Sequence, residues 1–270
     1  MPRFIFTKPF VAMADILRLT TVQTTLFWED AEANLAMFSK KLAGLAGLTD
    51  LVVLPEMFTT GFSMDAPRLA EPMDGRTMIW LAEQARMTGA VVTGSFIAKE
   101  DVRYFNRLVW MRPDGSFELY DKRHLFSPAA EHETYTKGQK KLITEWLGWK
   151  ICPLICYDLR FPVWSRNVES YDLLLYVANW PDRRSHHWKS LLTARAIENQ
   201  CYVAGVNRCG TDGVGFHYSG DTSVVDFSGK NLHQIADVEN ILTISISMEK
   251  LQDYRRSLQF LADKDDFTIF

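Results

Sequence analysis

A single cysteine stands directly after an apolar run in the middle of the chain. Ile151 to Ile155 have the pattern of a buried strand, Cys156 follows it, and Pro162 stands where the first turn of a helix tolerates proline. A thiol at such a turn lies near backbone N–H groups that have no intrahelical partner. Those groups can lower a thiol pKa and bind an oxyanion. Because free cysteines are also common core residues, the pattern by itself leaves both readings open.

Two more reactive side chains follow the ends of predicted strands. Glu56 comes just after an apolar strand at 51–54, and Lys122 just after a strand at 116–120. In an α/β sheet, strand ends are where reactive groups gather. An acid or a lysine in such a place is also commonly a solvated surface charge, and periodicity alone does not bring the three side chains together.

The elements that must position these residues alternate along the first half of the chain. An amphipathic helix is expected from the apolar residues Trp28 to Leu45, and a second helix over 75–88. Strands are expected at 17–22, 51–54, 90–98, 104–111 and 116–120. Residues 123–140 form a long polar loop with two acids, Glu131 and Glu133, and loops of this length are usually functional or mobile.

The second half repeats this alternation. A hairpin over 142–155 turns at Gly148, and Pro153 predicts a bulge or an unpaired position because it lacks an N–H. A helix is expected over 185–200, and the tail from Leu251 is charged with scattered aromatic residues. Further strands are expected at 173–177, 201–206, 220–227, 231–236 and 241–246.

No linker or low-complexity stretch divides the chain, which predicts one domain over residues 14–270. Residues 1–13 are predicted to be an N-terminal extension, with Met13 as the natural start. We expect residues 1–12 to be poorly ordered or held only by partner contacts.

Composition narrows the function classes. The net charge of -3 argues against nucleic-acid binding, and no apolar run approaches the roughly 20 residues of a membrane span. The four cysteines form no CxxC pair, and a chain of 270 residues needs no disulfides to fold. We therefore expect a cytoplasmic protein that contacts neither nucleic acid nor membrane.

Three segments in order resemble the signatures of the nitrilase superfamily of carbon–nitrogen hydrolases. They are Leu54-Pro55-Glu56-Met57-Phe58, Tyr120-Asp121-Lys122-Arg123-His124-Leu125-Phe126 and Cys156-Tyr157-Asp158-Leu159-Arg160-Phe161-Pro162. The likeness covers essentially residues 15–260. Within the superfamily, the segments 178–181, 194–200 and 218–221 are similar to bacterial omega-amidases, which hydrolyse the side-chain amide of 2-oxo acids such as 2-oxoglutaramate.

The resemblance implies an α/β fold of the four-layer αββα sandwich type and a Glu-Lys-Cys triad. Glu56 would be the general base, Lys122 the oxyanion stabiliser and Cys156 the nucleophile, with no metal and no cofactor. A further acid of the family follows the lysine. Glu131 matches it better than Glu133, but the sequence Glu131-His132-Glu133 leaves that choice open.

Physical chemistry supports these roles independently. A thiol with a pKa near about 8.5 is mostly protonated at neutral pH, so it needs a base or a positive field. Glu56 can take the thiol proton and give it to the leaving ammonia. Attack on an amide puts negative charge on oxygen, where Lys122 and the backbone N–H of Tyr157 can stabilise it.

The partner implied is a small-molecule amide. An omega-amidase must also hold the far carboxylate and keto group of its substrate. Arg184 matches that position in the bacterial omega-amidase branch, Trp180 is expected to form an apolar wall, and Arg160 is a weaker candidate expected against Asp158. The charged tail and the resemblance predict a dimer or a higher homo-oligomer.

Other readings remain open. The chain could be another nitrilase-superfamily amidase or nitrilase with a different small substrate, or a catalytically dead scaffold. A papain-like protease is disfavoured because Cys156 lacks the surroundings of that family. A zinc site from Cys152, Cys156, His186 and His187 lacks a recognised ligand spacing.

Overall fold

The computed structural model describes residues 14–269 of the chain. The predicted extension over residues 1–13 lies outside the described residues, and the single domain over 14–270 stays a prediction. Among the described residues, no helix is both long enough and apolar enough to cross a bilayer.

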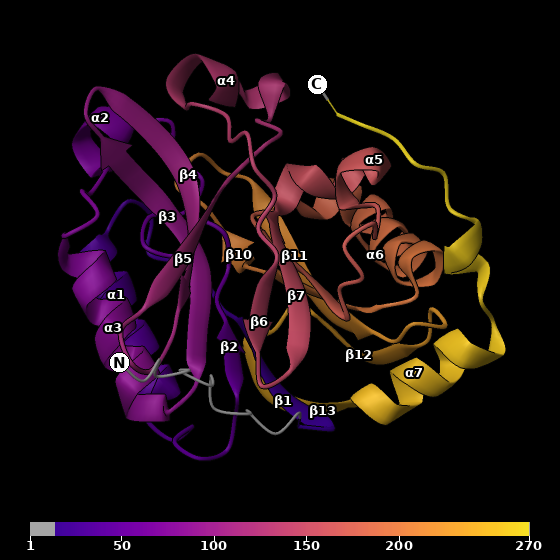
Figure 1. Ribbon diagram of the computed structural model, residues 1–270. Coiled ribbons are helices and arrows are strands. Elements are labelled where there is room, and N and C mark those ends of the chain that lie inside the picture. The colour runs from indigo at the N-terminus through magenta and orange to yellow at the C-terminus, as the bar shows by residue number, and fades with distance from the viewer. Residues whose placement is uncertain (1–13, 270) are drawn as a thin grey trace, which may run out of the picture.

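Two β-sheets face each other between two layers of helices (Figure 1). Across the first sheet the strands are β13 (Asn240–Ser247), β1 (Ile16–Gln23), β2 (Leu51–Val53), β3 (Val91–Glu100), β4 (Arg103–Met111) and β5 (Phe117–Asp121). Across the second they are β10 (Cys209–Thr211), β11 (His217–Val225), β9 (Tyr202–Asn207), β8 (Leu173–Ala178), β7 (Trp149–Ile155) and β6 (Thr144–Trp146), with β12 (Asn231–Ala236) paired to β11.

Helices cover the outer face of each sheet. Figure 1 shows α1 (Ala31–Leu42) and α3 (Arg76–Thr88) outside the first sheet, and α5 (Pro162–Ser165) and α6 (Ser185–Asn199) outside the second. The remaining helices are α2 (Ala66–Leu69), α4 (Glu131–Thr134) and α7 (Met248–Ser257). The fold is therefore the four-layer αββα sandwich that the resemblance implied.

Strand β2 shows why the sequence folds into these layers. Leu51 and Val53 point into the core between the sheets, whereas Val52 and Leu54 pack toward the helices α1 and α3. Because alternate residues face opposite sides and both sides are covered, a wholly apolar strand is required here. β2 pairs in parallel with β1 and β3, as a central buried strand does.

The structure corrects several predicted boundaries. The first helix begins at Ala31 rather than near Trp28, because Asp30 accepts a hydrogen bond from the N–H of Ala33 and caps it. The long loop over 123–140 contains α4, and the charged tail contains α7, whose N-cap is Ser247.

Pro153 causes no bulge. The ladder between β7 and β8 is continuous from Ile151 to Ile155, while β6 pairs only with 149–151 at the other edge of β7. Proline is therefore tolerated because β7 has no β6 partner at that position.

Candidate active site

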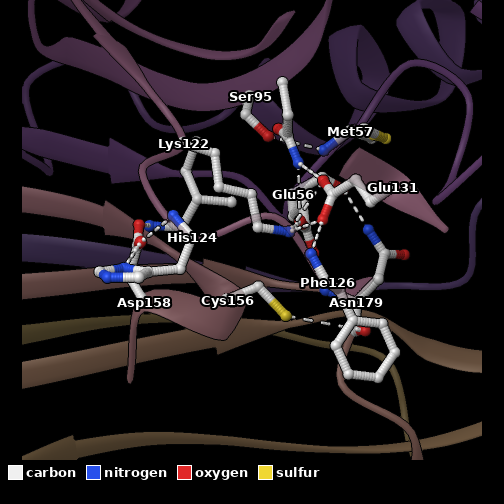
Figure 2. A network of polar contacts seen from close by, with 12 residues as sticks. Glu56, Met57, Ser95, Lys122, His124, Phe126, Glu131, Cys156, Asp158 and Asn179 are labelled. Carbon is white, nitrogen blue, oxygen red and sulfur yellow. Dashed lines mark hydrogen bonds and ion pairs between the residues drawn. The ribbon is translucent and has the colours of Figure 1, made fainter. Parts of the chain in front are cut away.

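The ends of three strands bring together the three predicted reactive residues. Glu56 follows β2, Lys122 follows β5 and Cys156 follows β7. The Nζ of Lys122 lies 2.8 Å from Oε1 of Glu56, and Figure 2 shows the Cys156 thiol beside this pair. The packing of the two sheets thus brings these three side chains together, which the sequence periodicity alone did not predict.

Two of these strand ends carry the same backbone feature. Met57, next to Glu56, and Cys156 itself both have φ of +42°. This left-handed region is unfavourable for residues with a side chain and persists only where the surroundings enforce it. The Oγ of Ser95 accepts a hydrogen bond from the N–H of Met57 at 2.9 Å, and Asp158 accepts one from the N–H of Ile155 at 3.0 Å. A side chain therefore holds the backbone at each of these two strand ends.

A buried network of charges lies beside the thiol. Lys122 donates to Glu56 and to both oxygens of Glu131, at 3.0 and 2.9 Å, and all three side chains are at most 1% exposed. The Nδ2 of Asn106 bridges the same two acids at 2.8 and 3.2 Å. Buried charges persist only when they are paired and hydrogen-bonded, and this group meets that condition.

The network shifts the proton affinities of its members. Burial lowers the pKa of Lys122, but the carboxylates of Glu131 and Glu56 outweigh it and raise that pKa, which keeps the amine charged. Burial raises the pKa of Glu131, with the charge of Lys122 acting against it.

The structure places Glu131, and not Glu133, in this network. Glu131 is fully buried and also accepts the backbone N–H of Phe126, whereas Glu133 is exposed on α4. The two residues lie on different sides of one short helical turn, so only one of them faces Lys122.

A glycine fixes the backbone of Lys122. Gly138 donates its N–H to the carbonyl oxygen of Lys122 at 2.9 Å. A Cβ added to Gly138 would lie 2.0 Å from the carbonyl oxygen of Asp121, so any larger residue must displace the end of β5.

Cys156 is held as a thiol at rest. Burial raises its pKa, the charge of Glu56 raises it further, and Lys122 acts in the opposite direction. Its Sγ lies 3.9 Å from the carbonyl oxygen of Asn179. The thiol therefore requires a base at the moment of attack, and Glu56 is the adjacent carboxylate.

A pocket of about 860 Å³ opens above Cys156 and Lys122. The three residues predicted to bind substrate, Tyr157, Trp180 and Arg184, all line it. Trp180 is buried and fixed: its backbone N–H donates to Asn207 at 2.8 Å and its Nε1 to the carbonyl of Arg184 at 2.9 Å. It forms the expected wall.

Three arginines line the same pocket. The guanidinium carbons of Arg160, Arg183 and Arg184 lie 4.7, 4.9 and 5.3 Å from the ring centres of Trp180, Phe216 and Phe126. Within residues 14–269, none of the three forms an ion pair with a carboxylate. Burial, and then the charge of Arg183, lower the pKa of Arg184.

The expectation that Arg160 packs against Asp158 was wrong. Asp158 is fully buried and its oxygens accept from Tyr120, His124 and the backbone of Ile155. The side chain of Arg160 instead turns into the pocket and contacts His187 at 3.2 Å.

Sequence reasoning missed two asparagines that hold Glu56. The N–H of Asn179 donates to Oε2 of Glu56 at 2.7 Å, its Nδ2 donates to the carbonyl of Glu56 at 2.6 Å, and Asn106 approaches from β4. Asn179 follows the buried strand β8, so the strand-end rule applied to Cys156 would have found it. Asn106 is a polar residue inside an apolar strand, which is a weaker signal.

Comparisons with known proteins show the family to which the chain belongs. Residues 18–256 match the model of the carbon–nitrogen hydrolase family, and the chain belongs to that family. Among solved structures, a CN-hydrolase superfamily protein from Xanthomonas campestris, XC1258, superposes with a TM-score of 0.94 at 46% identity, covering 95% of this chain and 100% of that one.

Two curated relatives show which members of this family the chain is similar to. The chain is 46% identical to "Omega-amidase YafV" of Escherichia coli (strain K12), over 94% of this chain and 99% of the relative. It is 34% identical to "2-oxoglutaramate amidase" of Bacillus subtilis (strain 168), over 79% of this chain and 84% of that protein.

Proposed function

We propose that this protein hydrolyses the side-chain amide of 2-oxo dicarboxylic acid monoamides, such as 2-oxoglutaramate and 2-oxosuccinamate, to the acid and ammonia. The observation that carries the proposal is the buried Glu56–Lys122–Glu131 network beside a pocket-facing thiol. The names of the relatives, omega-amidase and 2-oxoglutaramate amidase, support the substrate class.

The first half-reaction forms a thioester. Glu56 takes the proton of Cys156 while the sulfur attacks the amide carbon, and the resulting oxyanion is stabilised by Lys122 and the backbone N–H of Tyr157. When the tetrahedral intermediate collapses, the C–N bond breaks and Glu56 returns the proton to the leaving nitrogen. Ammonia departs and the acyl group stays on sulfur.

The second half-reaction restores the enzyme. Glu56 removes a proton from a water that attacks the thioester carbon, the C–S bond breaks, and the proton returns to the sulfur. Glu131 serves as the fourth member of the site by accepting from Lys122 alongside Glu56 and by sharing Asn106 with it. No step requires a metal or a cofactor.

The arginines account for a substrate that carries a carboxylate at the end far from its amide. Arg184, stacked on Phe126 and without a carboxylate partner within residues 14–269, presents a planar donor to a carboxylate of the substrate. Trp180 bounds the carbon chain, and Arg160 is a second donor on the same wall.

An ammonia-release assay over several substrates tests the proposal. We expect 2-oxoglutaramate and 2-oxosuccinamate to be hydrolysed faster than glutamine, asparagine and simple nitriles. Cys156→Ala should abolish release and keep the fold, while Cys209→Ala, whose side chain does not line the pocket, should behave as the parent. Highest activity on a nitrile or an amino-acid amide would contradict the proposed substrate class. The proposed roles of Glu56, Lys122 and Cys156 would still stand.

The alternatives predict different results in the same assay. Another amidase or nitrilase of the superfamily would prefer a different small amide or nitrile. A non-catalytic scaffold would release no ammonia from any of them, although its Cys156 would still react with iodoacetamide.

We also infer a homodimer or higher oligomer in the cytoplasm. All four cysteines are free thiols, in keeping with a reducing compartment. The C-terminal segment exposes Phe267 and Ile269, in keeping with contacts to a second copy. Sedimentation that shows only a 31 kDa species at micromolar concentration would contradict the oligomer.

A further inference from the structure

A second hollow, of about 400 Å³, shares a wall residue with the catalytic pocket. Its ionisable walls are Arg123, His124, His132 and Lys137, with the hydroxyl of Ser127 beside them, and we call these five residues the basic hollow. No aspartate or glutamate lines it among the described residues. Tyr157 lines both this hollow and the catalytic pocket and so forms the wall between them.

The hollow is built from the chain neighbours of the catalytic network. Arg123 follows Lys122, His132 follows Glu131, and Tyr157 follows Cys156. In each of these three pairs the first residue belongs to the catalytic site and the second lines the hollow. A charge bound in the hollow therefore contacts residues that are chain neighbours of the groups that hold the reacting atoms.

Two of these walls, Arg123 and His124, are already fixed in place. The Nη1 of Arg123 donates to the carbonyl of Gly138 and to Gln139, both at 3.2 Å, and its guanidinium lies 5.2 Å from the ring centre of Trp164. These contacts use one end of the guanidinium, which leaves other N–H groups as donors.

His124 is held just as firmly. Its ring stacks on Phe161 with centres 3.7 Å apart and planes 7° apart, and its Nδ1 lies 2.8 Å from Asp158 (Figure 2). Because Nδ1 is engaged by Asp158, Nε2 is the ring nitrogen left for a ligand, and it donates to an anion when the ring is protonated. Preorganised donors of this kind lose little entropy when they bind an anion.

The other two walls, His132 and Lys137, are exposed. His132 and Lys137 take part in no ion pair within residues 14–269, and neither does Arg123. The backbone beside Lys137 is anchored, since Thr136 donates to Tyr104 and Gly138 to Lys122. The guanidinium of Arg123 and the ammonium of Lys137 converge here with two imidazole rings and a hydroxyl group. Such a set favours a small, multiply charged oxyanion held by charge-assisted hydrogen bonds.

We propose that the basic hollow binds a small dianionic oxyanion, and that its occupancy changes the turnover of the adjacent catalytic site through Tyr157 and the Lys122 segment. Inorganic phosphate and a free dicarboxylate are both small oxyanions that can carry two negative charges. The site is independent of which amide the enzyme hydrolyses.

Titration calorimetry with inorganic phosphate tests the proposal, at low ionic strength because exposed charges are screened by salt. The double variant His132→Ala/Lys137→Ala removes the two exposed side chains of the basic hollow, and Arg184→Ala removes a cation of the catalytic pocket instead. We expect the double variant to weaken phosphate binding by about tenfold or more, and Arg184→Ala to leave it nearly unchanged. Succinate in a parallel titration distinguishes the carboxylate source from the phosphate source.

Steady-state ammonia release with and without phosphate gives the second readout. Phosphate should change kcat or KM of the parent at least twofold, and should change neither in the double variant, whose activity without phosphate should match that of the parent. Absence of binding, binding that Arg184→Ala removes and the double variant keeps, or binding without any change in turnover would each overturn the proposal.

Discussion

The floor of the catalytic pocket (Glu56, Lys122, Glu131) and its mouth (Arg160, Arg183, Arg184) both carry charge, but they hold it in opposite ways. On the floor every charge is buried and paired, with Asn106 closing the network. At the mouth the arginines are stacked on aromatic rings and have no carboxylate partner within residues 14–269.

The acids near the mouth explain why these arginines remain available. Glu29 and Asp65 are both paired with Arg68, and Asp212 accepts the hydroxyl of Tyr218 at 2.8 Å. The floor is thus organised to hold its own charges in one geometry, and the mouth to receive a charge from outside. Catalysis should depend on the first and substrate choice on the second.

The largest expected effect comes from breaking the floor. Lys122→Ala leaves Glu56 and Glu131 buried without their cation, which should lower the free energy of unfolding by about 3–5 kcal/mol. Turnover should fall by at least about 10²–10³, because an oxyanion donor is lost as well. Urea unfolding and ammonia release measure the two losses, with exposed Lys40→Ala as the control. An active, fully stable Lys122→Ala protein would contradict the view that Lys122 neutralises the two buried acids and stabilises the oxyanion.

A smaller change to the floor tests geometry without removing a charge. Gly138→Ala places a Cβ against the carbonyl of Asp121 and should shift Lys122, lowering kcat by about 10²-fold if the displacement is near 1 Å. Gly44→Ala is the matched control, since no atom lies within 4 Å of its added Cβ. Unchanged kcat in Gly138→Ala would mean that the position of Lys122 tolerates more freedom than proposed.

At the mouth the expected effect is on binding. Arg184→Ala should raise KM for 2-oxoglutaramate about tenfold or more, the value of a lost charged hydrogen bond, and leave turnover of a simple uncharged amide nearly unchanged. Arg183→Ala, whose side chain is exposed, should have the weaker effect. Equal losses on both substrates would assign Arg184 to the structure of the pocket instead.

The smallest effect concerns the thiol between the two regions. Because burial and Glu56 raise the pKa of Cys156, its thiolate is the minor form at neutral pH and increases with pH. The rate of alkylation by iodoacetamide should therefore keep rising beyond about pH 8.5, the value of a free thiol. Lys122 lowers this pKa, so Lys122→Ala should slow alkylation at a given pH. A plateau below pH 8.5 in the parent would contradict the direction of the shift.

Much of the candidate site could be predicted from the sequence, because local rules govern strand ends. Buried apolar runs predicted β2 and β7, and therefore placed Glu56 and Cys156 just beyond them. The three signature segments went further and implied the αββα layers, which the packing of the two sheets confirms. Helix boundaries depend on other interactions: the first helix begins three residues after Trp28 because the side chain of Asp30 caps it there.

What only the tertiary structure decided are the contacts between segments that are far apart in the chain. Glu131 and Glu133 are the same residue type two positions apart, and only the packing of α4 against Lys122 selects the first. Arg160 lies against Trp180 rather than Asp158 because Asp158 is already saturated by Tyr120, His124 and Ile155. A sequence records which residue types are available, but burial and hydrogen-bond competition among distant segments determine which of them meet.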